Sequence, residues 1–586
     1  MRWHAASATA ASAVLCASLA SGCAGSVPAA RVFPDRPVAW QEHDDGDVAR
    51  PPADTDLVDQ DVTLVLRDSL AGEVDYHLTR EGRRPARDVN ALDEVPCSTW
   101  FCPRNHLQAM SPAEVAIGPP ATPPRPPFRI MKGKARGSAL GFEVIDAAGR
   151  KFLLKPDVAG HRGMASAAEV VGDRIFHAAG YSVPGSFVLD VNPATDLTLD
   201  PAATFILYEV ERRPLTAERL RDQLAQSARG ADGRIRAVAV SWLPGKIVGA
   251  FDMIGRRPDD PNDRIPHEQR RSLRASRLLF AWLAVLDAGT LNTLDSYVEE
   301  RDRRFVRHYF IDFGAGLGSS TTRAKGPQQG HEYLVEVGRS LAALGALGFY
   351  QRPYQRQRES WWRLAEEQPE IGWFTAEDFD PDEYRSGRKV PAHRRMTDRD
   401  AYWGAKLVTS FSDEQIAAVV AQTQLPLVEE IYLTRALRMR RDIIGRRYLR
   451  AATAVEGPYV AAAGRALCFD DLAIARGYAA AGEVRYDVAI TDESGRPRGA
   501  YSARPTAAIT MGTLGGSPNP PAMARGEQSS PTRHAITCVP LPSAGGDYRV
   551  VEVRTVFPGE TETSRPARAA RVHLAGTSIL GLERDE

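Results

Sequence analysis

An acidic residue at the end of a long apolar strand is the feature that most limits what this chain can fold into. Residues 305–313 alternate as a strand does, which places His308, Phe310 and Asp312 on one face. A carboxylate in so apolar a segment is costly to bury without a partner. Asp312 therefore indicates that a cation lies at the end of this strand.

A second group of oxygen side chains precedes that strand. Asp287 and Asn292 follow an apolar helix predicted over residues 278–286, which breaks at Gly289. Oxygen ligands that converge from the end of a helix and the end of a strand suit a hard cation such as Mg²⁺. Asp295 is a further carboxylate close to Asn292, and it remains open whether Asp295 shares the metal.

Lysine is scarce in this chain, because only eight of its 74 basic residues are lysines. Lys155 lies in a strand predicted over residues 151–157, and beside an apolar core its charge needs an anionic partner. Glu169 lies on a small-residue strip, with Gly172, of a helix predicted over residues 165–179. From there Glu169 could reach Lys155. The alternatives are a strand-end lysine that reaches solvent and a solvated helix carboxylate.

A glycine-bearing turn precedes these elements at residues 132–141. Glycine has no side chain to keep phosphate oxygens away from backbone N–H groups. Gly137, Ser138 and Gly141 are therefore candidates for binding the phosphates of a nucleotide, although most loops of this kind are only turns.

In this order, the lysine strand, the Glu helix, the Asp-x4-Asn loop and Asp-Phe-Gly after a strand resemble the protein-kinase layout. Val285 and Leu286 stand before Asp287 where many kinases have His-Arg, and no Ala-Pro-Glu follows. The chain is therefore more similar to the atypical kinases, which include the phosphatidylinositol-kinase and HipA-like groups. The resemblance covers roughly residues 128–450.

The resemblance implies ATP and Mg²⁺ as cofactors and a role for each residue. Lys155 would hold the α- and β-phosphates, and Glu169 would orient Lys155. Asp287 would accept the proton of the attacking hydroxyl, while Asn292 and Asp312 would bind the metal. The segment 315–330 contains Ser319, Ser320, Thr321 and Thr322 and is either a substrate-facing or self-modified loop or a flexible surface loop.

The start of the chain is predicted to be an export signal. Residues 1–22 have a short cationic start, an apolar stretch and small residues before Cys23, as in a secretory signal peptide. The run Leu-Ala-Ser-Gly-Cys resembles the lipobox of bacterial lipoproteins, which implies that Cys23 is lipidated and that the protein is anchored in the cell envelope, at the outer membrane if there is one. An ordinary signal with a chance cysteine is the alternative.

Four cysteines remain after Cys16 and Cys23. An even number in an oxidising compartment suggests pairing. Proximity favours one disulfide between Cys97 and Cys102 and a second between Cys468 and Cys538. Zinc at the first pair is a weaker alternative, because no second pair of metal ligands lies nearby.

The predicted fold class is α+β: a two-lobed kinase-like core, with a small β-sheet lobe and a helical lobe, followed by a small β-sandwich-like domain. The predicted units are a signal peptide (1–22), a lipid-anchored flexible tether (23–60), an N-terminal extension with a Pro-rich linker (61–127), the core (128–450, with lobes 128–245 and 246–450) and a β-rich domain (451–586). Strands are predicted over residues 62–66, 484–490, 535–540, 548–557 and 570–574.

The charge balance limits the partners. Seventy-four basic and 74 acidic residues give no net charge, which argues against a dedicated nucleic-acid binder. The remaining hypotheses are an extracytoplasmic kinase that acts on a protein or lipid hydroxyl, a pseudokinase, and a non-catalytic envelope scaffold or binding protein. An exported protein has no standing ATP pool, which keeps the second and third hypotheses open.

Overall fold

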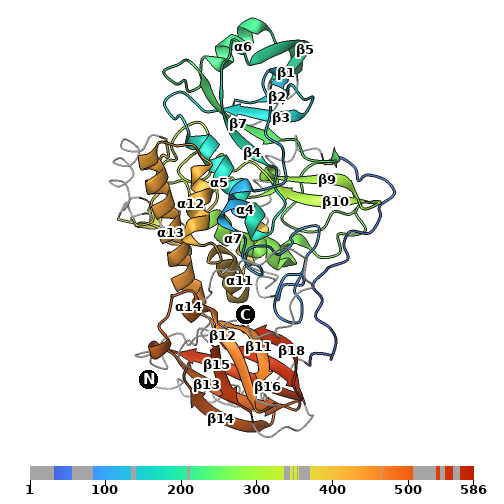
Figure 1. Ribbon diagram of the computed structural model, residues 1–586, viewed down its shortest axis with the longest axis vertical. Helices are drawn as coiled ribbons and strands as arrows, with labels where there is room; N and C mark the ends of the chain where they lie inside the picture. Colours follow the sequence, from blue (N-terminus) through green and yellow to red (C-terminus); the bar gives the residue numbers. More distant parts are fainter. Residues whose placement is uncertain are drawn as a thin grey trace, which may run out of the picture.

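The computed structural model describes residues 32–55, 84–133, 140–207, 211–334, single residues and short runs between 339 and 354, and residues 370–461, 464–505, 536–541, 548–557 and 568–586. The fold is α+β, as predicted. Figure 1 shows a sheet lobe at one end of the molecule, a second group of sheets at the other end, and helices between them. The signal segment, Cys23 and the strand predicted over residues 62–66 lie outside the described residues.

A seven-stranded sheet forms the first lobe, in the order β4-β7-β3-β2-β1-β5-β6. Its strands are β1 (Phe128–Gly133), β2 (Phe142–Ile145), β3 (Lys151–Pro156), β4 (Ser186–Val191), β5 (Leu197–Leu207), β6 (Glu211–Pro214) and β7 (Ile235–Ser241). Only the β1–β5 pair among them is parallel. Helix α5 (Met164–Ala179) contacts β4 and β7, and the short helix α6 (Ala217–Leu224) follows β6.

Helices dominate the central part of the molecule. They are α7 (Arg271–Trp282), α10 (Pro391–Arg394), α11 (Asp398–Val408), α12 (Asp413–Ala421) and α13 (Leu427–Leu449), with 3-10 turns η3 (His267–Gln269) and η4 (Thr290–Asn292). A three-stranded sheet of β8 (Lys246–Ile247), β9 (Thr293–Glu300) and β10 (Arg303–Phe310) lies beside them. Among these helices, α11 packs on both α7 and α13, and α12 also packs on α13.

Helix α7 ends earlier than the sequence predicts, at Trp282 rather than at residue 286. The Arg440 guanidinium of α13 donates hydrogen bonds to the carbonyls of Ala281 and Trp282. The Arg440 side chain therefore supplies hydrogen-bond donors to the carbonyl oxygens at the end of α7. Two residues after Trp282, Ala284 has a left-handed backbone conformation with φ of 50°. The apolar run beyond Trp282 is buried as a loop, which the hydrophobic pattern cannot distinguish from a helix.

The C-terminal domain contains two sheets, as the β-sandwich prediction requires. One consists of β11 (Val455–Ala461), β12 (Ala466–Asp471) and β15 (Ile536–Pro540); the other consists of β14 (Pro497–Ala503), β13 (Arg485–Asp492), β16 (Tyr548–Val556), β17 (Ala570–Ala575) and β18 (Ser578–Arg584). Short helix α14 (Leu472–Ala475) and turn η7 (Ala481–Glu483) link them. Phe469 and Tyr486 pack edge to face between the two sheets.

Both predicted disulfides are present. Cys468 and Cys538 face each other on β12 and β15, with Cα atoms 4.0 Å apart. Cys97 and Cys102 are joined within the segment before α4 (Pro112–Ile117), with Cα atoms 3.9 Å apart. The zinc alternative for the first pair is therefore wrong.

The tether predicted over residues 23–60 is wrong for residues 32–55, which lie against the body. The N–H of Phe33 donates to the Tyr548 hydroxyl on β16, and Asp44 accepts hydrogen bonds from Thr99. Val48 donates its N–H to the carbonyl of Arg304 on β10. The low periodicity of this segment gave no sign of these contacts, because backbone groups make many of them.

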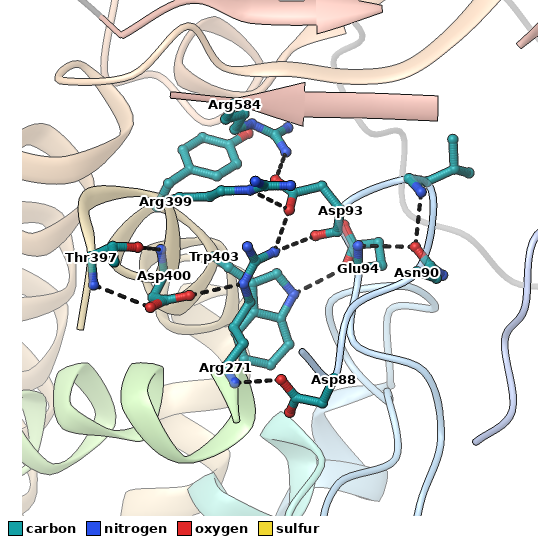
Figure 2. A network of polar contacts seen from close by, with 12 residues as sticks. Asp88, Asn90, Asp93, Glu94, Arg271, Thr397, Arg399, Asp400, Trp403 and Arg584 are labelled. Atoms are coloured by element: carbon teal, nitrogen blue, oxygen red, sulfur yellow. Dashed lines mark hydrogen bonds and ion pairs between the residues drawn. The ribbon is translucent and has the colours of Figure 1, made fainter. Parts of the chain in front are cut away.

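Residues 84–118 are likewise part of the body. Asp93 is fully buried and accepts hydrogen bonds from Arg271 of α7 (2.6 Å), Arg399 of α11 (2.8 Å) and Arg584 of β18 (2.6 Å). Figure 2 shows this junction, where the N-terminal segment meets two helices and a strand of the C-terminal domain. Asp88 accepts hydrogen bonds from the N–H of Ser272 and from its hydroxyl, at the start of α7.

Among the residues that the structure describes, no helix is long and apolar enough to cross a membrane.

Candidate active site

Lys155 lies between two carboxylates where β3, α5 and the loop after β10 meet. Its Nζ donates to Glu169 Oε2 at 3.0 Å and to Asp312 Oδ1 at 2.9 Å. Lys155 and Glu169 are buried, whereas the Asp312 side chain is 30% exposed. The contact that the sequence analysis expected between Lys155 and Glu169 is therefore present, and neither of the solvated alternatives applies.

The pKa of Lys155 follows from this position. Burial disfavours its charge, but the Asp312 and Glu169 carboxylates offset that effect and raise the pKa of Lys155 above its ordinary value. Lys155 is thus a fixed positive charge. Of its two carboxylate partners, Asp312 is the one that a ligand can reach.

Asp157, directly after β3, bonds to the start of α5. Its Oδ1 accepts from the N–H of Ser166, and its Oδ2 accepts from the N–H of Gly163 and the Ser166 hydroxyl. These are free donors at the start of the helix, which a carboxylate stabilises. Gly163 has φ of 104°, and an added Cβ would lie 2.6 Å from a Leu425 methyl carbon. Asp157 was not among the residues predicted from the sequence, because it caps the helix from outside the usual N-cap position.

The Asp-Phe-Gly segment packs closely against α5. Asp312 has φ of 59°, which is uncommon for a residue other than glycine. Phe313 is buried and packs on Phe176 of α5, with ring centroids 4.8 Å apart. A Cβ at Gly172 would lie 2.3 Å from Phe313 Cβ, so the close approach of α5 to this segment requires glycine there. This contact explains the small-residue strip beside Glu169.

Asn292 lies next to Asp312. Its Nδ2 donates to the carbonyl of Asp312 at 3.3 Å, and its own carbonyl accepts the N–H of Ile311 at 3.0 Å. β10 ends at Phe310, so Asp312 lies in the loop rather than on the strand face that the sequence analysis expected.

Asp287 is exposed at the loop that follows α7. The N–H of Leu286 donates to the carbonyl of Ala315 at 3.0 Å, which places this loop beside the segment that follows Gly314. Tyr384 donates its hydroxyl to the carbonyl of Val285, two residues before Asp287. The loop that contains Asp287 and the segment that follows Gly314 therefore run side by side.

The remaining candidates are Asp295, Gly141, Gly137 and Ser138. Asp295 is not a metal ligand, because it is fully buried and its two oxygens bond to His308 Nδ1 (2.6 Å) and Arg257 Nη1 (2.9 Å). Gly141 is buried just before β2. Gly137 and Ser138 lie outside the described residues.

The segment 315–330 is not a surface loop along its whole length. Ser319 is fully buried and accepts the N–H of Thr321 on its hydroxyl. The Ser320 hydroxyl accepts from Gln329 Nε2 at 2.9 Å. Thr321 and Thr322 are half-buried.

The donor set fits a magnesium ion that binds together with a nucleotide. In the described part of the chain, no three His, Cys, Asp or Glu side chains are grouped so that they could hold a metal ion alone. Mg²⁺ is commonly held by one or two carboxylates together with substrate phosphates and water. Asp312 offers a partly exposed carboxylate and Asn292 an amide oxygen, and Lys155 supplies a positive charge beside them.

Comparisons with solved structures give distant likenesses, three of which are described here. No family model matches the chain, and no curated protein matches its sequence. The proinflammatory kinase CtkA of Helicobacter pylori is similar at a TM-score of 0.29 and 10% identity, over 55% of this chain and 99% of that one. The Golgi casein kinase is similar at 0.28 and 10%, over 66% of this chain and 88% of that one.

A second structure of the Golgi casein kinase, with Mn/ADP bound, is similar at a TM-score of 0.27 and 11% identity, over 68% of this chain and 91% of that one. All three solved structures are of kinases. At TM-scores this low, these likenesses do not establish a function for this chain.

Proposed function

We propose that this protein is a kinase-like phosphotransferase that binds ATP with Mg²⁺ and transfers the γ-phosphoryl group to a hydroxyl of a protein or lipid. The observation that carries the proposal is the position of Lys155 between Glu169 and Asp312, with hydrogen bonds of 3.0 and 2.9 Å. A buried lysine held by one buried and one accessible carboxylate is the arrangement that phosphate binding and metal binding need.

In the proposed reaction each residue acts on a stated atom. Lys155 neutralises phosphate oxygens, and Glu169 holds its ammonium group in place. Asp287 accepts the proton of the attacking hydroxyl while that oxygen bonds to the γ-phosphorus and the bond from phosphorus to the β–γ bridging oxygen breaks, which releases ADP. Asp312 and Asn292 would hold Mg²⁺, which supplies charge neutralisation at the phosphates.

Two variants of the purified protein test the proposal. Asp312→Asn is expected to abolish the Mg²⁺-dependent rise in melting temperature with ATP, because it removes the metal-binding carboxylate. Asp287→Asn is expected to keep that rise and to lower the transfer of labelled phosphate by orders of magnitude. Asp47→Asn, at an exposed ion pair with Arg304, is the control for both measurements.

The outcomes separate the hypotheses. An ATP-dependent rise without transfer in the wild type would identify a pseudokinase. An equal thermal response in wild type and Asp312→Asn would contradict the assigned nucleotide site and would leave a non-catalytic envelope scaffold.

We also propose that the protein is anchored in a bacterial cell envelope through a lipid on Cys23. The Cys97–Cys102 and Cys468–Cys538 disulfides support an oxidising compartment, since disulfides are rare in the cytosol. Labelled palmitate is expected in the wild type and not in Cys23→Ser. Equal labelling of the two would contradict the anchor.

A further inference from the structure

The Cys97–Cys102 disulfide closes a short loop, and this loop lies against the turn that ends α5. The N–H of Cys102 donates to the carbonyl of Gly180 at 2.9 Å, and the N–H of Asn105 donates to the carbonyl of Ala178 at 3.1 Å. The last carbonyls of a helix have no donor within the helix itself. The chain that starts at the disulfide therefore supplies donors to the end of α5.

Two side chains beside the disulfide hold the same turn. Arg104 Nη1 donates to the carbonyls of His177 at 2.5 Å and of Tyr181 at 3.1 Å. The Phe101 ring packs edge to face on the Tyr181 ring, with ring centroids 5.1 Å apart. A Cβ at Gly180 would lie 2.4 Å from a Phe101 ring carbon, so the loop and the end of α5 are in close contact.

The same loop also contacts β10. The carbonyl of Thr99 accepts the N–H of His308 at 3.3 Å. The buried Trp100 ring stacks on the His308 ring, with centroids 3.5 Å apart and planes 14° apart. Because β10 leads into the segment that contains Asp312, the loop contacts the elements before and behind the candidate active site.

The packing between these two elements leaves no room for independent movement. Helix α5 carries Glu169 and Gly172, and a Cβ at Gly172 would lie 2.3 Å from Phe313 Cβ. Interiors packed this closely transmit a displacement to their neighbours. A shift of α5 would therefore move Phe313 and, with it, the neighbouring Asp312.

The position of the disulfide suits a local role. Its two cysteines are half-buried, so the bond is not sealed within the core, and access is one of the factors that set the rate of thiol–disulfide exchange. They are 5 residues apart, whereas Cys468 and Cys538 are 70 apart. A shorter closed loop constrains the unfolded chain less, so this disulfide contributes less to global stability than the other one.

We propose that Cys97–Cys102 is a thiol–disulfide exchange site, and that its reduction releases the end of α5 and weakens the candidate active site. The reductant is an external dithiol. Its first thiolate attacks one sulfur of the bond, forms a mixed disulfide and expels the other cysteine as a thiolate, which takes up a proton. Its second thiol displaces the first cysteine. The dithiol loses two electrons and leaves as a disulfide, and Cys97 and Cys102 become thiols.

Only part of the proposal depends on the proposed function. The weakening of ATP binding rests on that function. Reduction of the bond and release of the end of α5 do not, because both can be measured without a nucleotide.

Hydrogen–deuterium exchange of the full chain measures the end of α5. The N–H groups of Gly180 and Tyr181 both donate to the carbonyl of Phe176 and report on this turn. Replacement of Cys97 and Cys102 by Ala is expected to speed their exchange about tenfold or more, because the loop no longer holds the turn. The Kd for ATP is expected to rise roughly two- to tenfold.

Replacement of Cys468 and Cys538 by Ala is the matched control, because this disulfide lies on β12 and β15 of the C-terminal domain. It is expected to leave exchange at the end of α5 unchanged. The amides of α13 serve as the internal reference in both double variants, and their exchange is expected to stay constant when the end of α5 is released.

The control variant also permits reduction of a single bond in folded protein, which avoids any failure of the other variant to fold. Its free thiols are first blocked by alkylation, and dithiothreitol or reduced thioredoxin is then added. New alkylation is expected at Cys97 and Cys102, together with faster exchange at the end of α5 that reoxidation reverses. Labelling at a lower concentration of thioredoxin would identify a protein dithiol as the reductant, and the opposite order would identify a small one.

Three results would overturn the proposal: no new alkylation of the folded protein, unchanged exchange at the end of α5 once both thiols are free, or equally faster exchange throughout α13. A wild type that binds ATP with the same Kd before and after release of α5 would contradict the link to the active site. Faster exchange in a protein whose wild type shows no response to ATP would contradict only the proposed function.

Discussion

Replacement of Asp93 by Asn is expected to destabilise the junction between the helical region and the C-terminal domain. The Asp93 carboxylate bonds to Arg271, Arg399 and Arg584, and all four side chains are buried (Figure 2). Asn tolerates the left-handed backbone at this position, where φ is 64°, so the change removes charge without added strain. Removal of one partner from a buried ion pair costs roughly 3–5 kcal/mol of unfolding free energy.

The pH dependence of the unfolding free energy gives a second, independent measure of the contribution of Asp93. Burial by itself would raise the pKa of Asp93, but the three arginines lower it from 3.8 to about 2. A depressed pKa contributes stability that is present above the unfolded pKa and lost as pH falls through the folded one. By linkage this contribution is roughly 2 kcal/mol, and it disappears as pH falls from about 4 to about 2.

Urea unfolding of the full chain, followed by near-UV circular dichroism, measures both effects. At pH 7 the midpoint of Asp93→Asn should lie well below that of the wild type, and the difference should narrow below pH 4. Asp47→Asn removes an exposed pair with Arg304 and should leave the midpoint unchanged. If Asp93→Asn and Asp47→Asn unfold at the same urea concentration, the arginine cluster does not hold the domains together.

Two further predictions concern single features. Gly172→Ala should lower stability by roughly 1–3 kcal/mol and weaken ATP binding, because its Cβ would collide with Phe313; a loss of stability with unchanged ATP affinity would contradict the link to the site. Replacement of both Cys468 and Cys538 by Ala should lower stability by about 2–4 kcal/mol in denaturation, whereas an unchanged midpoint would contradict a stabilising role.

Local patterns in the sequence were enough to predict the elements that carry the candidate site. The alternation of the Lys155 strand and the small-residue face of the Glu169 helix limit where these side chains can point, and they are in contact. The strand predicted over residues 548–557 corresponds to β16 (Tyr548–Val556), because alternating burial leaves a clear period in the sequence. The roles assigned to Lys155 and Glu169 remain predictions.

Polar contacts between distant segments could not be predicted in this way. Asp93 and Arg584 are 491 residues apart, and nothing near either residue in the sequence marks the other. Arg440 of α13 donates hydrogen bonds to the carbonyls at the end of α7. The sequence near α7 does not indicate this contact, so the apolar run after Trp282 was predicted to continue the helix. In both cases a buried charge takes its partners from the tertiary fold, and a local pattern contains no information about them.

Buried arginines and buried lysines have different partners in this chain, so the position of a buried lysine helps to locate a binding site. Arginines hold the interior together: Arg271 bonds to both Asp93 and Asp400, because its planar group carries several donors in a fixed geometry. Lysine offers a compact charge that suits one binding site or shifts its pKa when buried. Among the lysines that the structure describes, which are all but Lys134, three are buried: Lys155, Lys325 and Lys406. Lys406 is paired with Glu94 and Glu456 at the junction, whereas Lys155 lies where a ligand with phosphate oxygens is proposed to bind.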